Sequence, residues 1–342
     1  MAAQFPRLRY MGSKHRLVPQ LAEIFAEVFV DLAAGVARPT ALDAFSGSGV
    51  VSYTLKCLGY SVTSNDFLAF PATIAHAAVA NQRAHLSAAE VERIIGPPAD
   101  DRDFIRSTFD GLYFTADDRA YLDSAWSHVD GLRGAKRSLA VSALVLAAAR
   151  KQPRGVFTVT DLRYDDGRRD LRLPLREHFV EAVADYGAVV FDSGRPCRAK
   201  QADVFAVRPG FDLVYLDPPY APPRDDNCYV KRYHFLEGLS VYWRGQEIMQ
   251  QTRTKKLAKR DTPFGSKRSV TDALRRLVRR FADSTIVLSY SSNAVPDPET
   301  VAAILAEVKR DVEVRRVDHR YHFGTHVGAT RREAVEYVYI GR

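Results

Sequence analysis

The chain has 342 residues, of which 46% are hydrophobic, and a formal net charge of +8. The hydrophobic content excludes disorder over the whole length, and the length allows one or two domains with a sizeable core. The longest aliphatic run, residues 139–149, is too short to cross a bilayer, and the N-terminus lacks the apolar stretch of a signal peptide. We therefore expect a soluble, cytoplasmic protein. Three widely spaced cysteines argue against disulfides and structural zinc, so we expect no metal site.

The N-terminal third has the pattern of a βαβ unit. After the loop LRYMGSKHRL (residues 8–17), in which a helix starts near Lys14, the run TALDAF (40–45) predicts a short buried strand. The turn SGSG (46–49) leads into a helix that stops at Gly59, and YSVTSND (60–66) predicts a second strand before an alanine-rich helix over residues 71–81. This alternation predicts an α/β protein with a parallel sheet covered by helices on both faces.

The turn after the first strand has the composition of a cofactor loop. Gly47 and Gly49 would let the backbone bend sharply and a ligand approach closely, and Asp43 ends the strand before them. Asp66 ends the second strand, where an acid can accept hydrogen bonds from ribose hydroxyls. The third small residue of a dinucleotide-binding loop is replaced by Ser52, so the loop alone leaves open a tight turn without a ligand.

Residues 91–198 have a different character. Helical patterns over residues 116–129 and 136–150 are followed by the charged stretch RYDDGRRDLRLPLREHF (163–179), and a strand pattern returns at GAVVFDS (187–193). We interpret 91–198 as an inserted, mainly helical subdomain, and residues 1–90 and 199–342 as the domain that contains the sheet.

The C-terminal part returns to strands. The runs FDLVYLD (211–217) and STIVLSY (284–290) predict buried strands, and VEVRRVDHRYHF (312–323) with EAVEYVYIGR (333–342) predicts an antiparallel hairpin at the far end of the sheet. The first of these runs ends in Asp217-Pro218-Pro219-Tyr220. Proline has no N–H for strand pairing and a carboxylate is costly to bury alone, so this tetrapeptide should lie at the sheet edge, facing a polar ligand.

The positive charge is concentrated in residues 244–282, with twelve Lys or Arg against three acids. Arginines at helical spacing are typical of a solvated helix face, whereas the loop TRTKKLAKRDTPFGSKRS (252–269) suits a phosphate backbone. The candidate DNA contacts in this loop are Lys255, Lys256, Lys259, Arg260, Lys267 and Arg268.

Taken together, YMGSK, DAFSGSG, DPPY, RYHFLEGLSVYW and IVLSYSSN, in this order, resemble the D12-type adenine-specific DNA methyltransferases, the group that includes the Dam enzymes. The order, with the cofactor loop first and DPPY after a variable segment, is similar to the alpha arrangement of these enzymes. The resemblance implies a Rossmann-like fold, S-adenosylmethionine as cofactor and methylation of the adenine N6 amine in double-stranded DNA. It also implies that the inserted segment contributes to target recognition.

The same resemblance implies roles for individual residues. Asp217, Pro218, Pro219 and Tyr220 would form the catalytic pocket, with the Asp217 carboxylate and the Pro218 carbonyl accepting the two N–H groups of a flipped-out adenine. Asp43 would lie near the methionine end of the cofactor, Asp66 near its ribose and Asp203 near its adenine. The full set of implied cofactor contacts is Tyr10, Lys14, Asp43, Phe45, Gly47, Gly49, Asp66, Asp203 and Phe205.

Other functions remain compatible with parts of this pattern. Methylation of cytosine N4, an RNA adenine or a protein glutamine is one class, although those families more often have Ser or Asn in place of Asp217. A DNA-binding relative without turnover is another class, and the intact cofactor loop and Asp217 argue against it. The sequence leaves open a cognate restriction enzyme, the DNA site and the oligomeric state.

Overall fold

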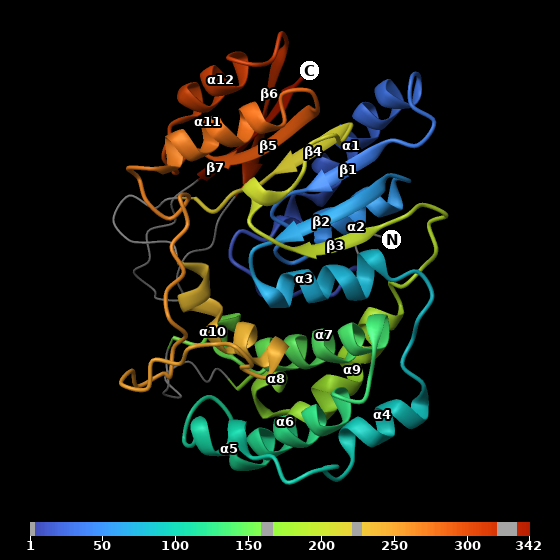
Figure 1. The fold of residues 1–342 in the computed structure, drawn as a ribbon, viewed down its shortest axis with the longest axis vertical. Coiled ribbons are helices and arrows are strands. Elements are labelled where there is room, and N and C mark those ends of the chain that lie inside the picture. The colour runs from blue at the N-terminus through green and yellow to red at the C-terminus, as the bar shows by residue number, and fades with distance from the viewer. Residues whose placement is uncertain (1–3, 159–166, 221–227, 320–333) are drawn as a thin grey trace.

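The computed structural model describes residues 4–158, 167–220, 228–319 and 334–342 (Figure 1). Its seven strands form one sheet in the order β3-β2-β1-β4-β5-β7-β6. Neighbouring strands from β3 to β5 pair in parallel, whereas β7 is antiparallel to both β5 and β6. The strands are β1 (Thr40–Asp43), β2 (Ser61–Asp66), β3 (Arg198–Gln201), β4 (Leu213–Leu216), β5 (Thr285–Ser291), β6 (Val312–His319) and β7 (Ala334–Gly341).

This topology confirms the predicted mostly parallel, Rossmann-like sheet with an antiparallel C-terminal pair. The segment that joins β6 to β7 lies outside the described residues, as does the proline-containing stretch 221–227 that follows DPPY. Successive side chains of a strand point to opposite faces, so Ala41 and Leu42 enter different cores. Helices α1 (Val18–Ala33) and α2 (Val50–Cys57) pack in the first core, and α11 (Val270–Arg280) and α12 (Pro298–Ala306) in the second.

A layer of helices continues beyond the β3 edge of the sheet (Figure 1). Helix α3 lies against β3, and α7 packs on α3, α9 and α10. The layer consists of α3 (Ala69–Ala75) with a π-helical turn (His76–Ala80), α4 (Ala88–Ile95), α5 (Phe104–Thr108), α6 (Ala116–Val129), α7 (Gly134–Arg150), α8 (Arg169–Arg172), α9 (Leu175–Gly187) and α10 (Tyr229–Val241). Short 3₁₀ turns occur at Lys14–Arg16, Pro153–Gly155 and Val204–Ala206. The helical patterns over 116–129 and 136–150 correspond to α6 and α7.

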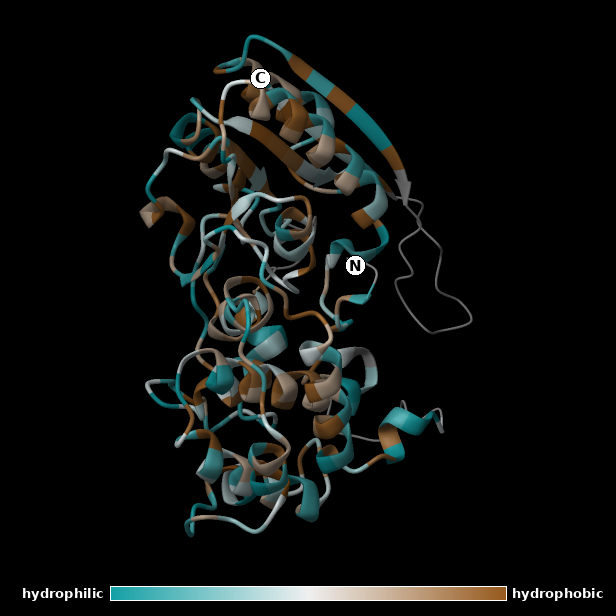
Figure 2. Cartoon of the chain, turned by 90° about the vertical axis from the view of Figure 1, so that its right-hand side faces the viewer, coloured by the Kyte–Doolittle hydropathy of each residue, from teal (hydrophilic) through white to brown (hydrophobic). Residues whose placement is uncertain are grey.

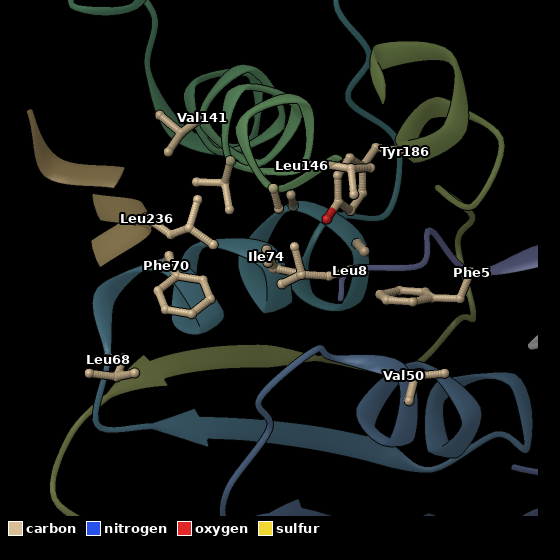
Figure 3. Close-up of a cluster of buried hydrophobic side chains, with 14 of the residues drawn as sticks. Phe5, Leu8, Val50, Leu68, Phe70, Ile74, Val141, Leu146, Tyr186 and Leu236 are labelled. Atoms are coloured by element: carbon tan, nitrogen blue, oxygen red, sulfur yellow. The ribbon is translucent and has the colours of Figure 1, made fainter. Parts of the chain in front are cut away.

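Helix α7 is apolar on all sides because helices surround it. Its residues 139–149 are all buried, which accounts for the aliphatic run. Figure 3 shows Val141 and Leu146 of this helix in one buried cluster with Ile74 of α3 and Leu236 of α10. Among the helices of the described residues, none has both the length and the apolar character needed to cross a membrane. That 91–198 forms a separate subdomain stays a prediction.

One strand prediction was wrong at the β3 edge, and the strand that forms this edge was not predicted. The run GAVVFDS does not form a strand, because Gly187 ends α9 and the following residues are irregular, with Val189 buried in the core as an anchor. The strand at this edge is instead the polar β3, whose side chains are mostly exposed. At the opposite edge β6 alternates between hydrophilic and hydrophobic residues (Figure 2).

Candidate active site

A cavity of about 730 Å³ lies at the carboxyl ends of β1, β2 and β4. Ligands of open α/β sheets bind beyond this edge of the strands, which is where the sequence placed DPPY. Most of the predicted site residues line the cavity: Tyr10, Lys14, Phe45, Gly47, Asp66, Asp203, Asp217, Pro218, Pro219, Tyr220, Lys259, Arg260, Lys267 and Arg268. Asp43, Gly49, Phe205, Lys255 and Lys256 do not line it.

The glycine loop needs both of its glycines for conformational reasons. Gly47 and Gly49 have φ angles of 48° and 84°, in the left-handed region that disfavours side chains. A Cβ on Gly47 would lie 2.9 Å from Cε1 of Tyr10, so the N-terminal segment approaches the loop closely. Gly49 immediately precedes α2, and the turn therefore directs the start of this helix toward the cavity.

Asp66 holds the glycine loop in place. Its Oδ2 accepts a hydrogen bond of 2.8 Å from Gly47 N, and its Oδ1 accepts one of 2.9 Å from Leu68 N. Burial raises the pKa of Asp66 to about 6, although the backbone N–H groups of Leu68 and Gly47 oppose the shift. The carboxylate thus has two backbone donors and retains lone pairs toward the cavity that it lines.

Asp43 is fully buried behind the same loop. Its Oδ2 accepts a 2.6 Å hydrogen bond from Ser52 Oγ, and Oδ1 is an acceptor with no hydrogen-bond partner among the described residues. Burial raises the pKa of Asp43 to about 7, against the lowering effect of Ser52. Ser52, which replaces the small residue of a dinucleotide-binding loop, is therefore the partner of this acid.

Four side chains form a charged cluster at the end of β4, namely Lys14, Asp217, Tyr220 and Glu336. Lys14 Nζ lies 2.8 Å from Asp217 Oδ1, 3.2 Å from Glu336 Oε1 and 3.0 Å from the Tyr220 hydroxyl. The Tyr220 hydroxyl lies 2.6 Å from Glu336 Oε1 and 3.0 Å from Asp217 Oδ1. Burial raises the pKa of Asp217, Lys14 opposes this shift and Glu336 adds to it. Glu336 has no signal in the sequence that would mark it as a site residue.

The comparisons with known proteins agree with this site. The family model of the D12 class N6 adenine-specific DNA methyltransferases matches residues 10–287, which contain the glycine loop and the DPPY tetrapeptide. The chain belongs to this family. The predicted family, reaction and cofactor are therefore confirmed: this D12 methyltransferase transfers a methyl group from S-adenosylmethionine to N6 of adenine in DNA.

Individual relatives are similar over most of the methyltransferase. It is 26% identical over 335 residues to the type II methyltransferase M2.HphI of Haemophilus parahaemolyticus, a match that covers 93% of each chain. The modification methylase StsI of Streptococcus sanguinis is 23% identical over 356 residues, with 95% of this chain covered. The type II methyltransferase M.FokI of Planomicrobium okeanokoites is 23% identical over 321 residues, with 87% covered. The D12 methyltransferase spans 50% and 46% of the last two relatives.

The residues of the D12 methyltransferase fit S-adenosylmethionine. The buried Oδ1 of Asp43, which has no hydrogen-bond partner among the described residues, would be the acceptor for the charged amine at the methionine end. Asp66 and Asp203 line the cavity and would be the acceptors for ribose and adenine, and Asp203 Oδ1 also accepts a 2.9 Å hydrogen bond from Phe205 N. Within the described ranges, His, Cys, Asp and Glu do not gather in threes as a metal site would require.

Aromatic rings build two walls of the cavity, and the sequence predicted them only in part. On one side Tyr10 stacks on Tyr233 with ring centroids 4.9 Å apart. On the other side Phe264 lines the cavity and contacts Phe45 edge-on at 5.3 Å. Phe205 lies behind this wall, stacked parallel to Phe264 at 5.9 Å. Phe264 was missed because a single phenylalanine in a basic loop gives no signal of its own.

The basic residues of the methyltransferase differ in their surroundings. Lys267 and Arg268 are exposed at the cavity, and their loop leads into α11. Arg260 is held 3.3 Å from Oε1 of the buried Glu237, which also accepts the backbone N–H groups at the start of α3. Lys255 donates to Gln250 O, 2.8 Å away. That the six predicted residues bind DNA stays a prediction.

Proposed function

We propose that this D12 methyltransferase acts on double-stranded DNA and takes the target adenine out of the helix into the cavity beside Asp217. Chemistry on a base requires its removal from the stack, at a cost of a few kcal/mol. The single observation that carries the proposal is the position of Asp217, whose carboxylate directly follows β4, lines the cavity with its side chain 16% exposed, and lies 2.8 Å from Lys14 Nζ.

The proposed role of Asp217 follows from the chemistry of the amine. The N6 nitrogen of adenine is a poor nucleophile because its lone pair is delocalised into the ring. Hydrogen bonds from its two N–H groups to the Asp217 carboxylate and the Pro218 carbonyl draw the nitrogen toward a tetrahedral geometry. When bound, S-adenosylmethionine supplies a methyl group on a positively charged sulfur. The positive charge that develops on nitrogen is then stabilised by the Asp217 carboxylate.

Tyr220 supplies the face against which the base is proposed to rest, and the buried Tyr290 packs against its ring. The two rings meet edge-on with centroids 4.9 Å apart, and the Tyr220 hydroxyl is held in the charged cluster. A fixed ring of this kind offers base stacking worth roughly 1–3 kcal/mol. Asp43, Asp66 and Asp203 are the proposed acceptors for the cofactor, and Tyr10 lines the cavity next to Gly47 of the glycine loop.

The test is single-turnover methylation of a duplex by Asp217→Ala, with 2-aminopurine at the target position to report base flipping. Removing one preorganised electrostatic partner should slow methyl transfer by about a hundredfold or more. DNA affinity and the fluorescence change should persist, because the lost interaction strengthens only in the transition state. Asp272→Asn, an exposed acid of α11 that pairs with Arg275, is the control and should react at the wild-type rate. A wild-type rate for Asp217→Ala would refute the mechanism.

We also propose that the enzyme protects DNA from a cognate restriction enzyme and that residues 91–198 contribute to recognition of the DNA sequence. The support is the similarity to relatives that are named type II methyltransferases and a modification methylase. DNA from cells that express the protein can be sequenced with detection of modified bases. One methylated adenine in a fixed sequence context supports the proposal, and methylation without sequence context contradicts it.

A further inference from the structure

The reversed direction of β7 brings an additional acid to the active site. Because β7 is antiparallel to β5, its first residues lie at the edge where β4 and β5 end. Glu336 pairs in register with Ser291, the last residue of β5, on one side and with Val317 of β6 on the other. This position is outside the residues matched by the family model, 10–287.

Glu336 is fully buried, and its contacts in the charged cluster explain how a carboxylate is accommodated there. A buried acid is costly unless charged or polar groups pair with it. Oε1 of Glu336 lies 3.2 Å from Lys14 Nζ and 2.6 Å from the Tyr220 hydroxyl. The hydroxyl has one proton to donate, and its distance to Asp217 is longer, 3.0 Å, so Glu336 is the favoured acceptor.

The balance of charge gives Glu336 a role beyond packing. Lys14 and Asp217 alone would form a neutral pair, which has little attraction for positive charge on a nearby nitrogen. Among the described residues, Glu336 adds a second carboxylate to this pair, so that Lys14 is shared between two acids. Sharing Lys14 in this way leaves Asp217 a stronger attraction for a substrate nitrogen that becomes positive in the transition state.

We propose that Glu336 is a positioning residue of methyl transfer, which holds Lys14 and the Tyr220 hydroxyl and prevents Lys14 from fully neutralising Asp217. The inference rests on the proposed role of Asp217. It assigns to Glu336 an effect on the rate of the chemical step, with little effect on the binding of DNA or cofactor.

The proposal has a consequence for pH dependence. The reaction needs Asp217 in its charged form, and burial raises the pKa of Asp217, with Lys14 lowering it and Glu336 raising it. Loss of the Glu336 charge should therefore lower the pKa of Asp217 and move the acid limb of the rate profile to lower pH. The titratable groups that face Asp217 are Lys14, Tyr220, Glu336, Asp43, Tyr10, Tyr215 and Tyr229.

The experiment compares single-turnover rates of wild type, Glu336→Gln and Glu336→Asp from acid to neutral pH. For Glu336→Gln we expect a plateau about tenfold or more below wild type and an acid limb at lower pH, with affinities for DNA and S-adenosylmethionine within about twofold. Glu336→Asp keeps the charge but is shorter, so its plateau should fall while its acid limb stays in place. A wild-type plateau or an unmoved limb for Glu336→Gln overturns the proposal. If Glu336→Gln does not fold, a wild-type plateau for Glu336→Asp overturns it.

Asp123→Asn is a matched control. Asp123 is a buried carboxylate of α6 that accepts a tyrosine hydroxyl, Tyr242 at 2.7 Å, and does not line the cavity. This variant should lose stability without moving the acid limb of its rate profile. If the acid limb does move, lost stability alone explains the effect of Glu336→Gln, and the proposal is overturned. A wild-type rate for Asp217→Ala would refute the proposed function itself. An inactive Asp217→Ala beside a wild-type profile for Glu336→Gln would refute only the role of Glu336.

Discussion

Asp43 is a buried acid whose ionised form lowers the stability of the folded protein. Its carboxylate is fully buried, and one oxygen has a partner, Ser52, whereas the other has none among the described residues. The folded protein therefore favours the protonated acid, with a pKa raised by burial to about 7 from the ordinary 3.8. An acid whose folded pKa is raised makes the protein less stable as pH increases from about 4 to about 7.

We predict that Asp43→Asn stabilises the cofactor-free protein at pH 8 by up to about 4 kcal/mol, since each unit of pKa shift corresponds to about 1.4 kcal/mol. Near pH 4 the two proteins should be similar, because both then have a neutral side chain. Ser52→Ala removes a hydrogen bond that lowers the Asp43 pKa, so it should extend the window of falling stability to higher pH. Denaturant unfolding across this range is the measurement, and parallel curves for wild type and Asp43→Asn would contradict the prediction.

At the scale of elements, the basic segment divides into two parts with different uses. Arg275 and Arg279 of α11 lie 2.8 and 2.9 Å from Glu307, next to α12, and so join two helices on one face of the sheet. The loop before α11 instead places the exposed Lys267 and Arg268 at the cavity. The sequence allowed two interpretations of this segment, a solvated helix face and a loop suited to a phosphate backbone. The arginines of α11 correspond to the first, and the position of the loop at the cavity is compatible with the second.

This division predicts different effects on DNA binding. Neutralising Lys267 and Arg268 with glutamine should weaken DNA binding and flatten the plot of log affinity against log salt by about 0.9 for each lost phosphate contact. The same change at Arg275 and Arg279 should leave the slope unaltered, because these side chains form ion pairs with Glu307. Equal slopes for wild type and the Lys267 and Arg268 variant would remove the loop from the DNA interface.

Elements with a local signal could be predicted from the sequence, and elements that depend on long-range pairing could not. The strands β1, β4 and β5 follow from short apolar runs, β2 follows from the run YSVTSND after Gly59, and Gly59 marks the end of α2 because its φ is positive. The strand β3 is polar because it is an exposed edge, so it has no apolar pattern to detect. In the site, Asp217 and Asp66 follow strand ends, whereas Glu336 becomes part of the cluster only through the pairing of β7 with β5.

At the scale of the whole molecule, one core connects the helical layer with the sheet. Buried residues of α7 pack with those of α3 and α10 (Figure 3). The same cluster continues to Ala41 and Tyr215 in the strands. A contiguous core of this kind is typical of one cooperative unit, in which a defect in one layer is felt in the other.

We predict that Leu146→Ala lowers the free energy of unfolding by about 2–5 kcal/mol and leaves a single transition. Both tryptophans, Trp126 and Trp243, are buried in the helical layer, so their fluorescence reports on this layer, whereas circular dichroism reports on the whole chain. The two transitions should coincide. Val180→Ala, at an exposed position of α9, is the control and should change little. Separate transitions would show that residues 91–198 unfold as a unit of their own.

The position of Glu336 in β7 also affects when the enzyme becomes competent during its synthesis. A ribosome adds roughly 5–20 residues each second, so the segments that contain Lys14, the glycine loop and Asp217 exist for several seconds before Glu336 is made. If Glu336 has the role proposed above, a nascent or interrupted chain contains the cofactor loop and DPPY but lacks the acid that restrains Lys14. We expect no methylation until translation has passed β7, because this strand supplies Glu336 and also pairs with both β5 and β6 in the sheet.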